Sequence, residues 1–397
     1  MQTSIKITQK EYQTRITHLL ERVQEQRLSG VVLFDSYYIL YYTGFAFIPT
    51  ERPIAFMMNA KGETGLFVPR LEVEHAKANA IISHVAHYIE YPYAPHPMEA
   101  FRKMLGEMGI SSPVGADQDG YPWILGYRGP TLTEMIGQAP VRVTAIIEDQ
   151  MMVKSAAEVA LIKESVKWGH LAHMLLQRYT KVGATESEVS GRASLEATLT
   201  MLDTIGPIYR AQSFLSNGAE AGYRGQIGRN AAIPHALANN ITFQAGDVLV
   251  TGAGAPVWGY NSELERTMFI GRPSDRQKEF FDHMVALQDT AFAALGPGIP
   301  CSQVDQTVRA YYDEHNLWDY WKHHVGHAIG LRYHESPFLD LGDETVMLPG
   351  MVFTIEPGLY HPELGGFRHS DTVLITEDGI EILTYYPRDL ESLTIPL

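Results

Sequence analysis

The chain contains a single cysteine, Cys301, and no apolar run long enough to cross a bilayer. One cysteine excludes an internal disulfide and is typical of a reducing compartment. The first residues, MQTSIKITQKEYQTRI, lack the apolar segment of a signal peptide. We therefore expect a cytoplasmic protein that does not bind or span a membrane.

Positive charge is also scarce, with 31 basic residues against 46 acidic ones and a formal net charge of −15. This balance disfavours a nucleic-acid partner, because phosphates are bound mainly by lysine and arginine. It leaves a cationic or zwitterionic small molecule as the expected substrate. A hydrophobic content of 45% and a charged content of 19% are typical of a folded globular protein.

At 397 residues, the chain exceeds the size at which a single core keeps growing, so the sequence predicts two domains. Near residue 152 a new unit begins, where Ser155 and Glu158 have the spacing of a capping box. Apolar residues then recur at helical spacing: Val159, Ile162, Val166 and Leu175. We place the domain boundary between residues 152 and 153.

Residues 1–152 predict an α/β domain. Segments at about 9–27 and 98–108 are typical of helices. Four short segments predict strands: GVVLFDS, YYILYYTGF, PIAFMMN and ETGLFVP.

The second half carries a weak internal repeat, in which GATESEV (183–189) matches GIPCSQV (298–304) in Gly, Ser and Val. The sequence predicts one helix before and one after each copy. Such a repeat suggests two related halves around a shared site. Three matches in seven also arise by chance, so both interpretations stay open.

Residues able to perform chemistry gather in the second half, at expected strands and loops. They are His235, Glu263, Glu265, His323, His324, His327, His334, Glu356, Arg368, His369, Ser370 and Asp371. Glu263 and Glu265 lie one residue apart, so in a strand their carboxylates share one face. A local ion pair between Glu265 and Arg266 on an exposed strand is the less favoured alternative. Glu356 lies in an apolar strand, where an unpaired carboxylate is costly, so it is either a functional acid or half of a structural salt bridge.

The histidines allow two interpretations. His323 and His324 are either functional or hydrogen-bonded loop residues. His327 and His334 could be metal ligands or proton donors, as histidine often is near neutral pH.

Three segments resemble the carboxy-terminal motifs of the creatinase, prolidase and methionine aminopeptidase superfamily, peptidase family M24: HHVGHAIGLRYHESP, GMVFTIEPGLY and GFRHSDTVLITEDG. The resemblance covers the chain from about Lys154 onward. It implies an α+β protein of two domains: a creatinase/prolidase-like α/β amino-terminal domain, residues 1–152, and a pita-bread catalytic domain, residues 153–397. Relatives of this architecture are commonly homodimers, so we expect a homodimer.

The resemblance also implies where metal ligands would lie. Peptidases of the superfamily hold two metal ions with two aspartates, one histidine and two glutamates. Those positions correspond here to Gly252, Glu263, His327, Glu356 and Ser370. Because Gly252 and Ser370 carry no carboxylate, we expect no two-metal site and no required cofactor. A single divalent ion on Glu263, His327 and Glu356 is the remaining option.

The run Leu264–Thr267, LERT, resembles creatinase, which works without metal. In creatinase, glutamates matching Glu265 and Glu356 hold the guanidinium of creatine, and a histidine matching His235 acts as general base and acid. The resemblance therefore implies a metal-independent, non-peptide hydrolase of a C–N bond (amidine, ureido or amide) in a small nitrogen compound. The catalytic residues would be His235, Glu265, Glu356 and His327. The sequence departs from creatinase at Glu263 and Ser370.

Five residues are expected to bind the substrate: Glu263, His334, Arg368, Trp258 and Tyr260. The two aromatic residues would supply a cation–π wall, unless they belong to the core of a strand. Three alternatives stay open: a metal-dependent Xaa-Pro aminopeptidase or dipeptidase, a lyase on the same fold, and a binding protein that has lost its chemistry.

Overall fold

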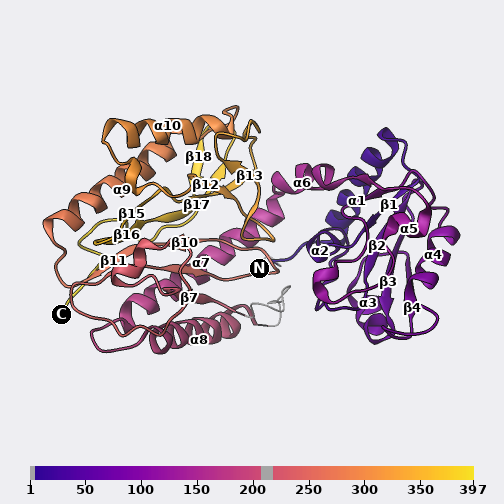
Figure 1. The fold of residues 1–397 in the computed structure, drawn as a ribbon, viewed down its shortest axis with the longest axis horizontal. Helices are drawn as coiled ribbons and strands as arrows, with labels where there is room; N and C mark the ends of the chain where they lie inside the picture. The colour runs from indigo at the N-terminus through magenta and orange to yellow at the C-terminus, as the bar shows by residue number, and fades with distance from the viewer. Residues whose placement is uncertain (1–4, 207–217) are drawn as a thin grey trace. The chain divides into compact units, whose positions relative to one another are not determined.

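The structure, a computed structural model, describes residues 5–206 and 218–397. Its contacts divide the chain into two compact units, one formed by Ile7–Met151 and one that contains the described residues after Met151. Figure 1 shows helices and strands in both units. No described helix is long and apolar enough to cross a membrane.

The first unit is built on one mixed sheet with the strand order β4-β3-β2-β1-β5-β6. Its strands are β1 (Gly30–Leu33), β2 (Ala55–Asn59), β3 (Thr64–Pro69), β4 (His84–Tyr88), β5 (Gly115–Ala116) and β6 (Val141–Arg142). Its helices are α1 (Gln9–Glu25), α2 (Ser36–Thr43), α3 (Val73–Asn79), α4 (Pro97–Glu107), α5 (Leu132–Ile136) and α6 (Thr144–Met152). The expected helices near 9–27 and 98–108 are confirmed as α1 and α4, and three of the expected strands as β1, β2 and β3.

The expected strand YYILYYTGF is wrong, because this segment forms helix α2. Asp35 caps the helix by accepting hydrogen bonds from the backbone N–H groups of Tyr37 and Tyr38. Gly44, with φ of 72°, ends it in the left-handed conformation. Most of its side chains are buried, so the sequence lacks the helical period of apolar residues that would have distinguished this segment from a strand.

The second unit contains a larger sheet with the order β13-β12-β14-β17-β10-β9-β7, to which β18 is added beside β17. Its strands are β7 (Glu220–Gly222), β9 (Gly252–Gly254), β10 (Leu264–Glu265), β12 (Gly326–Ala328), β13 (Glu335–Leu339), β14 (Val352–Ile355), β17 (Ser370–Ile375) and β18 (Ile380–Ile382). Two smaller sheets accompany it: β8 (Val248–Val250), β11 (Thr267–Ile270) and β19 (Thr394–Ile395), and a hairpin of β15 (Gly358–His361) and β16 (Gly365–Arg368).

Two pairs of helices pack around these strands (Figure 1). They are α7 (Ala156–Tyr179) with α8 (Glu186–Ile205), and α9 (Asp275–Ala294) with α10 (Cys301–Glu314). The first pair contacts β7 and the second contacts β13–β16. A helix therefore precedes and follows each copy of the internal repeat, as predicted. The capping box of Ser155 and Glu158 is confirmed at the start of α7.

The register of the large sheet brings distant segments together. Strand β10 lies between β9 and β17, with Leu264 opposite both Ala253 and Asp371. Strand β17 also pairs with β14, where Ile355 lies opposite Asp371. Strand β12 follows on the other side of β14, with Ala328 opposite Phe353. Because these strands are neighbours, side chains from β9, β10, β12, β14 and β17 can converge on one site.

Candidate active site

Glu263, His327 and Glu356 form a compact cluster whose ligand atoms all lie within 4.8 Å of one another. Nδ1 of His327 donates a hydrogen bond to the carbonyl of Ala328 (3.0 Å), so in the neutral ring the lone pair is on Nε2. Nε2 lies 3.2 Å from Oε1 of Glu356. It is buried and has no hydrogen-bond partner among the described residues. When the ring is neutral, this lone pair faces two carboxylates.

The pKa values of the three side chains are shifted because the cluster is buried and its charges lie close together. Burial and the neighbouring carboxylates of Glu356 and Glu265 raise the pKa of Glu263 to about 7. Burial alone would lower the pKa of His327, but contact with Glu356 and the charge of Glu263 raise it to about 9. Burial opposes ionisation of Glu356 too, yet His327 and Arg368 hold its pKa well below the usual range. Without a further cation, a proton on His327 compensates the acids.

Ser370 and Gly252 flank this cluster. Ser370 Oγ donates a hydrogen bond to Oε1 of Glu263 (2.8 Å). A Cβ added to Gly252 would lie 3.6 Å from Oε1 of Glu265 and 3.9 Å from Nη2 of Arg224. A carboxylate at residue 252 would therefore extend into space that Glu265 and Arg224 already fill.

Glu265 is paired with two arginines. Arg368 donates to both of its carboxylate oxygens, through Nη2 to Oε1 (2.8 Å) and through Nε to Oε2. Arg224 Nη2 donates to Oε1 across 2.6 Å. Glu265 and Arg368 are both buried, whereas the side chain of Arg224 is 51% exposed. The carboxylate that was expected to hold a substrate cation thus already has two cationic partners within the chain.

Arg266 points to different partners from Glu265. Its guanidinium is fully buried and donates to Asp371 Oδ1 (2.8 Å) and to the carbonyls of Tyr386 and Pro387. The side chains of Glu265 and Arg266 therefore do not form the local ion pair considered from the sequence. The Arg266–Asp371 pair instead ties β10 to β17 on the side of the sheet away from the cluster.

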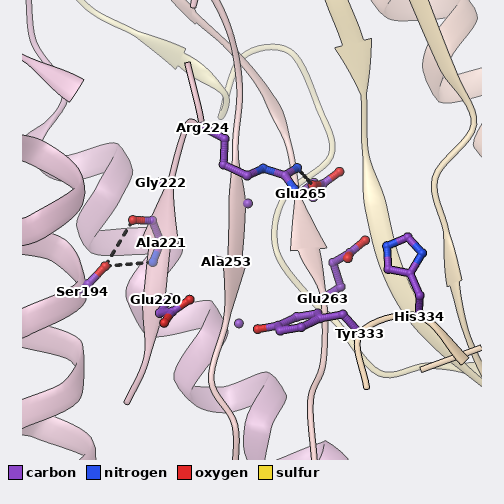
Figure 2. A pocket seen from close by; sticks show the side chains of 12 residues that line it. Ser194, Glu220, Ala221, Gly222, Arg224, Ala253, Glu263, Glu265, Tyr333 and His334 are labelled. Carbon is purple, nitrogen blue, oxygen red and sulfur yellow. Dashed lines mark hydrogen bonds and ion pairs between the residues drawn. The ribbon is translucent and has the colours of Figure 1, made fainter. Parts of the chain in front are cut away.

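A cavity of about 440 Å³ opens beside the cluster (Figure 2). It is lined by Ser194, Glu220, Ala221, Gly222, Arg224, Gly252, Ala253, Gly254, Glu263, Glu265, Tyr333 and His334. The ring of His334 stacks on that of His327, with centroids 3.9 Å apart. Burial, and then the neighbouring His327, lower the pKa of His334, so its imidazole is neutral at pH 7.

The remaining expected site residues lie around this cavity without lining it. His235 is exposed, and its electrostatic effect contributes to the lowered pKa of His334. Tyr260 is buried and its hydroxyl donates to Glu158 Oε1 (2.6 Å). Trp258 belongs to the same loop and is half-buried. His323 bonds to the hydroxyl of Tyr360, as expected for a hydrogen-bonded loop residue.

Arg224 was missed by reasoning from the sequence. It lies outside every recognised motif, at the start of a turn in which the N–H of Gln226 bonds to the carbonyl of Tyr223 (2.8 Å). The segment Tyr223–Gly225 carries one local signal, a glycine where a turn residue is expected, and this predicts a turn but no charge in a cavity. Its position became visible only once β7 and β10 were placed in the sheet.

The pattern of metallopeptidase family M24 matches residues 160–377, and that of the creatinase/prolidase N-terminal domain matches residues 15–153. The chain belongs to metallopeptidase family M24. Its fold is accordingly the two-domain α+β arrangement expected from the motifs, with a creatinase/prolidase-type first domain and a pita-bread catalytic domain.

Relatives extend over nearly the whole chain. A Xaa-Pro dipeptidase of Pyrococcus horikoshii is 28% identical over 382 residues, which cover 95% of this chain and 98% of the relative. A Xaa-Pro dipeptidase of Pyrococcus furiosus is 34% identical over 252 residues, 63% of this chain and 68% of that relative. The crystal structure of dipeptidase PepE from Mycobacterium ulcerans superimposes with a TM-score of 0.82 at 26% identity, covering 99% of this chain and 100% of that chain.

These relatives correct the function expected from the sequence. The similarity to creatinase, and with it the metal-independent, non-peptide C–N hydrolase, is wrong, because the similar proteins are dipeptidases. The error came from the run Leu264–Thr267 and from the missing carboxylates at Gly252 and Ser370, which weigh little against similarity over the whole chain. The expectation that no cofactor is required is likewise not supported, since the family is one of metallopeptidases and a group of three potential ligands is present.

The residues present fit one metal ion and not two. Glu263, His327 and Glu356 supply two carboxylates and an imidazole at mutual distances suited to one divalent cation, and the orphaned Nε2 of His327 is a ready ligand. At the other two positions of the family's ligand set, Gly252 has no side chain and Ser370 is hydrogen-bonded to Glu263. The second ion of the family therefore has no complete set of ligands here.

Proposed function

We propose that this chain is a dipeptidase that hydrolyses the amide bond of a small zwitterionic substrate of the Xaa-Pro type, with one divalent metal ion held by Glu263, His327 and Glu356. The names of the relatives support the reaction class. The cavity volume of about 440 Å³ supports a substrate of dipeptide size.

One observation carries the proposal: the buried Nε2 of His327 makes no hydrogen bond of good geometry, while the carboxylates of Glu263 and Glu356 lie beside it, the latter at 3.2 Å. A buried polar atom without a good hydrogen bond is costly, and two carboxylates at this spacing repel each other unless a proton or a cation lies between them. A divalent cation removes both penalties. The bond from Nδ1 to the Ala328 carbonyl already fixes the ring in the orientation that a ligand requires.

When bound, such an ion would polarise the amide carbonyl and lower the pKa of a water molecule. The chain's own residues would do the rest. Ser370 orients the carboxylate of Glu263. His334 lines the cavity as a neutral base, able to take a proton from the attacking water and return it to the leaving nitrogen.

Metal analysis combined with a cleavage assay tests the proposal. Protein loaded with Mn²⁺ and freed of excess metal should hold close to one ion per chain and should cleave glycyl-L-proline, and chelation should abolish both. His327→Asn should lose the ion and the activity together. His324→Asn is the matched control, because His324 lies three residues away and pairs with Asp340 instead (3.3 Å). Cleavage that survives complete chelation would refute the proposal.

We also propose that the chain acts as a cytoplasmic homodimer. The architecture shared with the dipeptidases supports the dimer, and the single cysteine supports a reducing compartment. Light scattering at micromolar concentration would show about twice the chain mass of 44.4 kDa, and a fully active monomer would contradict the dimer.

A further inference from the structure

We propose that the guanidinium of Arg224 takes the place of the family's second metal ion and binds a carboxylate group of the substrate. The inference rests on the proposed function for its choice of substrate. It adds the chemical group that is recognised and the residue that recognises it.

The location of Arg224 is the first argument. Gly252 stands at the family's first aspartate position and lines the cavity without a side chain. The nearest side-chain atoms to a Cβ at residue 252 are Oε1 of Glu265 at 3.6 Å and Nη2 and Nε of Arg224 at 3.9 and 4.0 Å. One face of the guanidinium therefore lies where that aspartate would project. Where the family has an aspartate that binds a metal ion, this chain thus has the positive charge of Arg224.

Charge is the second argument. Arg368 already neutralises Glu265 through contacts with both carboxylate oxygens. Arg224 adds one further contact, to Oε1, so Glu265 has a buried cationic partner even without Arg224. Arg368 also lies 3.8 Å from Oε2 of Glu356, so its charge is shared by two carboxylates. Only Nη2 of Arg224 donates to described residues, to Glu265 at 2.6 Å and to Gln226 Oε1 at 3.5 Å. Its Nε and Nη1 donate to none of the described residues, so either can contact a ligand, and a bidentate contact would also use the second N–H of Nη2.

Direction is the third argument. Arg368 is buried, whereas the side chain of Arg224 is half exposed and lines the cavity, so of the two arginines Arg224 is the one that a ligand can contact. Figure 2 shows its guanidinium beside the carboxylate of Glu265, joined to it by a dashed line. The exposed Glu220 lies near Ser194 in the same view, away from Arg224. An anionic group entering the cavity therefore meets Arg224 beside the acid cluster.

The backbone supports this placement. Arg224 adopts a positive φ of 52°, and Gly225 follows with φ of 75°. Consecutive positive φ values with a hydrogen bond from Gln226 to Tyr223 form a tight turn that favours asparagine, aspartate or glycine over a long side chain. An arginine in this conformation is uncommon, and such residues gather at functional sites. The turn directs the arginine toward Glu265.

A carboxylate is the anion that best fits this guanidinium. The planar fork of arginine matches a carboxylate through two parallel hydrogen bonds. A dipeptide carries a terminal carboxylate at a short distance from its amide bond. Binding that group at Arg224 would set the amide over Glu263, His327 and Glu356.

Binding of two probes tests the inference without any cleavage. The probes are an isostere of glycyl-L-proline in which a CH2–N bond replaces the amide, and the C-terminal carboxamide of the same isostere. Wild type should bind the carboxylate about 10- to 150-fold more tightly than the carboxamide, as expected for a charge-assisted contact. Arg224→Gln should lose this preference, and Arg224→Lys should keep part of it. Arg22→Gln is the matched control, because Arg22 is 52% exposed and ion-paired at 2.6 Å to Glu25 outside the cavity.

The outcomes separate this inference from the proposed function. Equal binding of both probes by wild type, or a preference that survives in Arg224→Gln, overturns the role of Arg224 and leaves the dipeptidase standing. If wild type binds neither probe, the dipeptide substrate is wrong. Thermal shifts with benzoate and benzamide at equal ionic strength then decide on Arg224. A rise in Tm specific to benzoate that Arg224→Gln abolishes supports the carboxylate site, and no such rise refutes it.

Discussion

Ser370 donates a hydrogen bond from its Oγ to Oε1 of Glu263 across 2.8 Å. At this position the family's ligand set has a glutamate, so a residue that would bind metal directly has become one that orients a neighbouring ligand. Within the cluster of Glu263, His327 and Glu356, Ser370 therefore orients the carboxylate of Glu263.

Replacing Ser370 by alanine should weaken the binding of Mn²⁺ by about 10- to 100-fold, the usual effect of removing a partner that orients a metal ligand. The ion should still bind, because all three ligands remain. Equilibrium dialysis would measure the change. Ser194→Ala is the control: Ser194 lines the same cavity, but its hydroxyl bonds to the backbone of Ala221. Equal affinity in wild type and Ser370→Ala would contradict the supporting role.

Metal binding should also depend steeply on pH. In the metal-free protein the pKa is raised to about 7 at Glu263 and to about 9 at His327, and both groups must lose their protons to bind a cation. Each ion should therefore release about two protons at pH 6 and about one at pH 8. Affinity for Mn²⁺ should fall as the pH falls from 9 to 6.

Isothermal titration in two buffers of different ionisation enthalpy would count these protons directly. The same titrations give the affinity at each pH. An affinity that stays constant between pH 6 and 8 would show that neither group carries a displaceable proton.

Glu265→Gln should destabilise the second unit, and not merely weaken substrate binding. Its carboxylate pairs with the buried Arg368, and the loss of one partner of a buried ion pair costs about 3–5 kcal/mol. Urea unfolding would measure the change. Glu220→Gln offers a matched control, since Glu220 lines the same cavity but is exposed. A variant as stable as wild type but poor in substrate binding would favour a direct contact between Glu265 and the substrate.

Two lysines allow a comparison of buried and exposed ion pairs. Lys154 Nζ contacts Glu335 Oε2 at 2.9 Å with both side chains buried, whereas Lys163 contacts Glu381 at 2.8 Å near the surface. Lys154→Met should cost about 3–5 kcal/mol because it leaves Glu335 buried and uncompensated. Lys163→Met should change stability by at most about 1 kcal/mol.

The same denaturation experiments would measure both lysine variants. Adding Glu335→Leu to Lys154→Met should recover part of the loss, because the unpaired charge is then removed. An equal loss of unfolding free energy in the two single variants would show that burial does not determine how much these ion pairs stabilise the fold.

Local features of the fold could be predicted from the sequence. The capping box at Ser155, the helices around both copies of the repeat, and helices α1 and α4 depend on contacts between residues a few positions apart. Helix α2 could not be predicted, because its six buried residues, three of them tyrosines, are equally typical of a strand and outweigh the capping signal of Asp35.

The sequence by itself determined the family's motifs and the identity of the three residues that gather as potential ligands, since Glu263, His327 and Glu356 lie in ordered, recognisable segments. Only the tertiary structure decided how the charges are shared. Glu265 is adjacent to Arg266 in the chain but pairs with Arg368 and Arg224, 103 and 41 residues away. The physical reason is that successive side chains of a strand point to opposite faces of the sheet, so the partner of a charge is set by strand register and not by its neighbour in sequence.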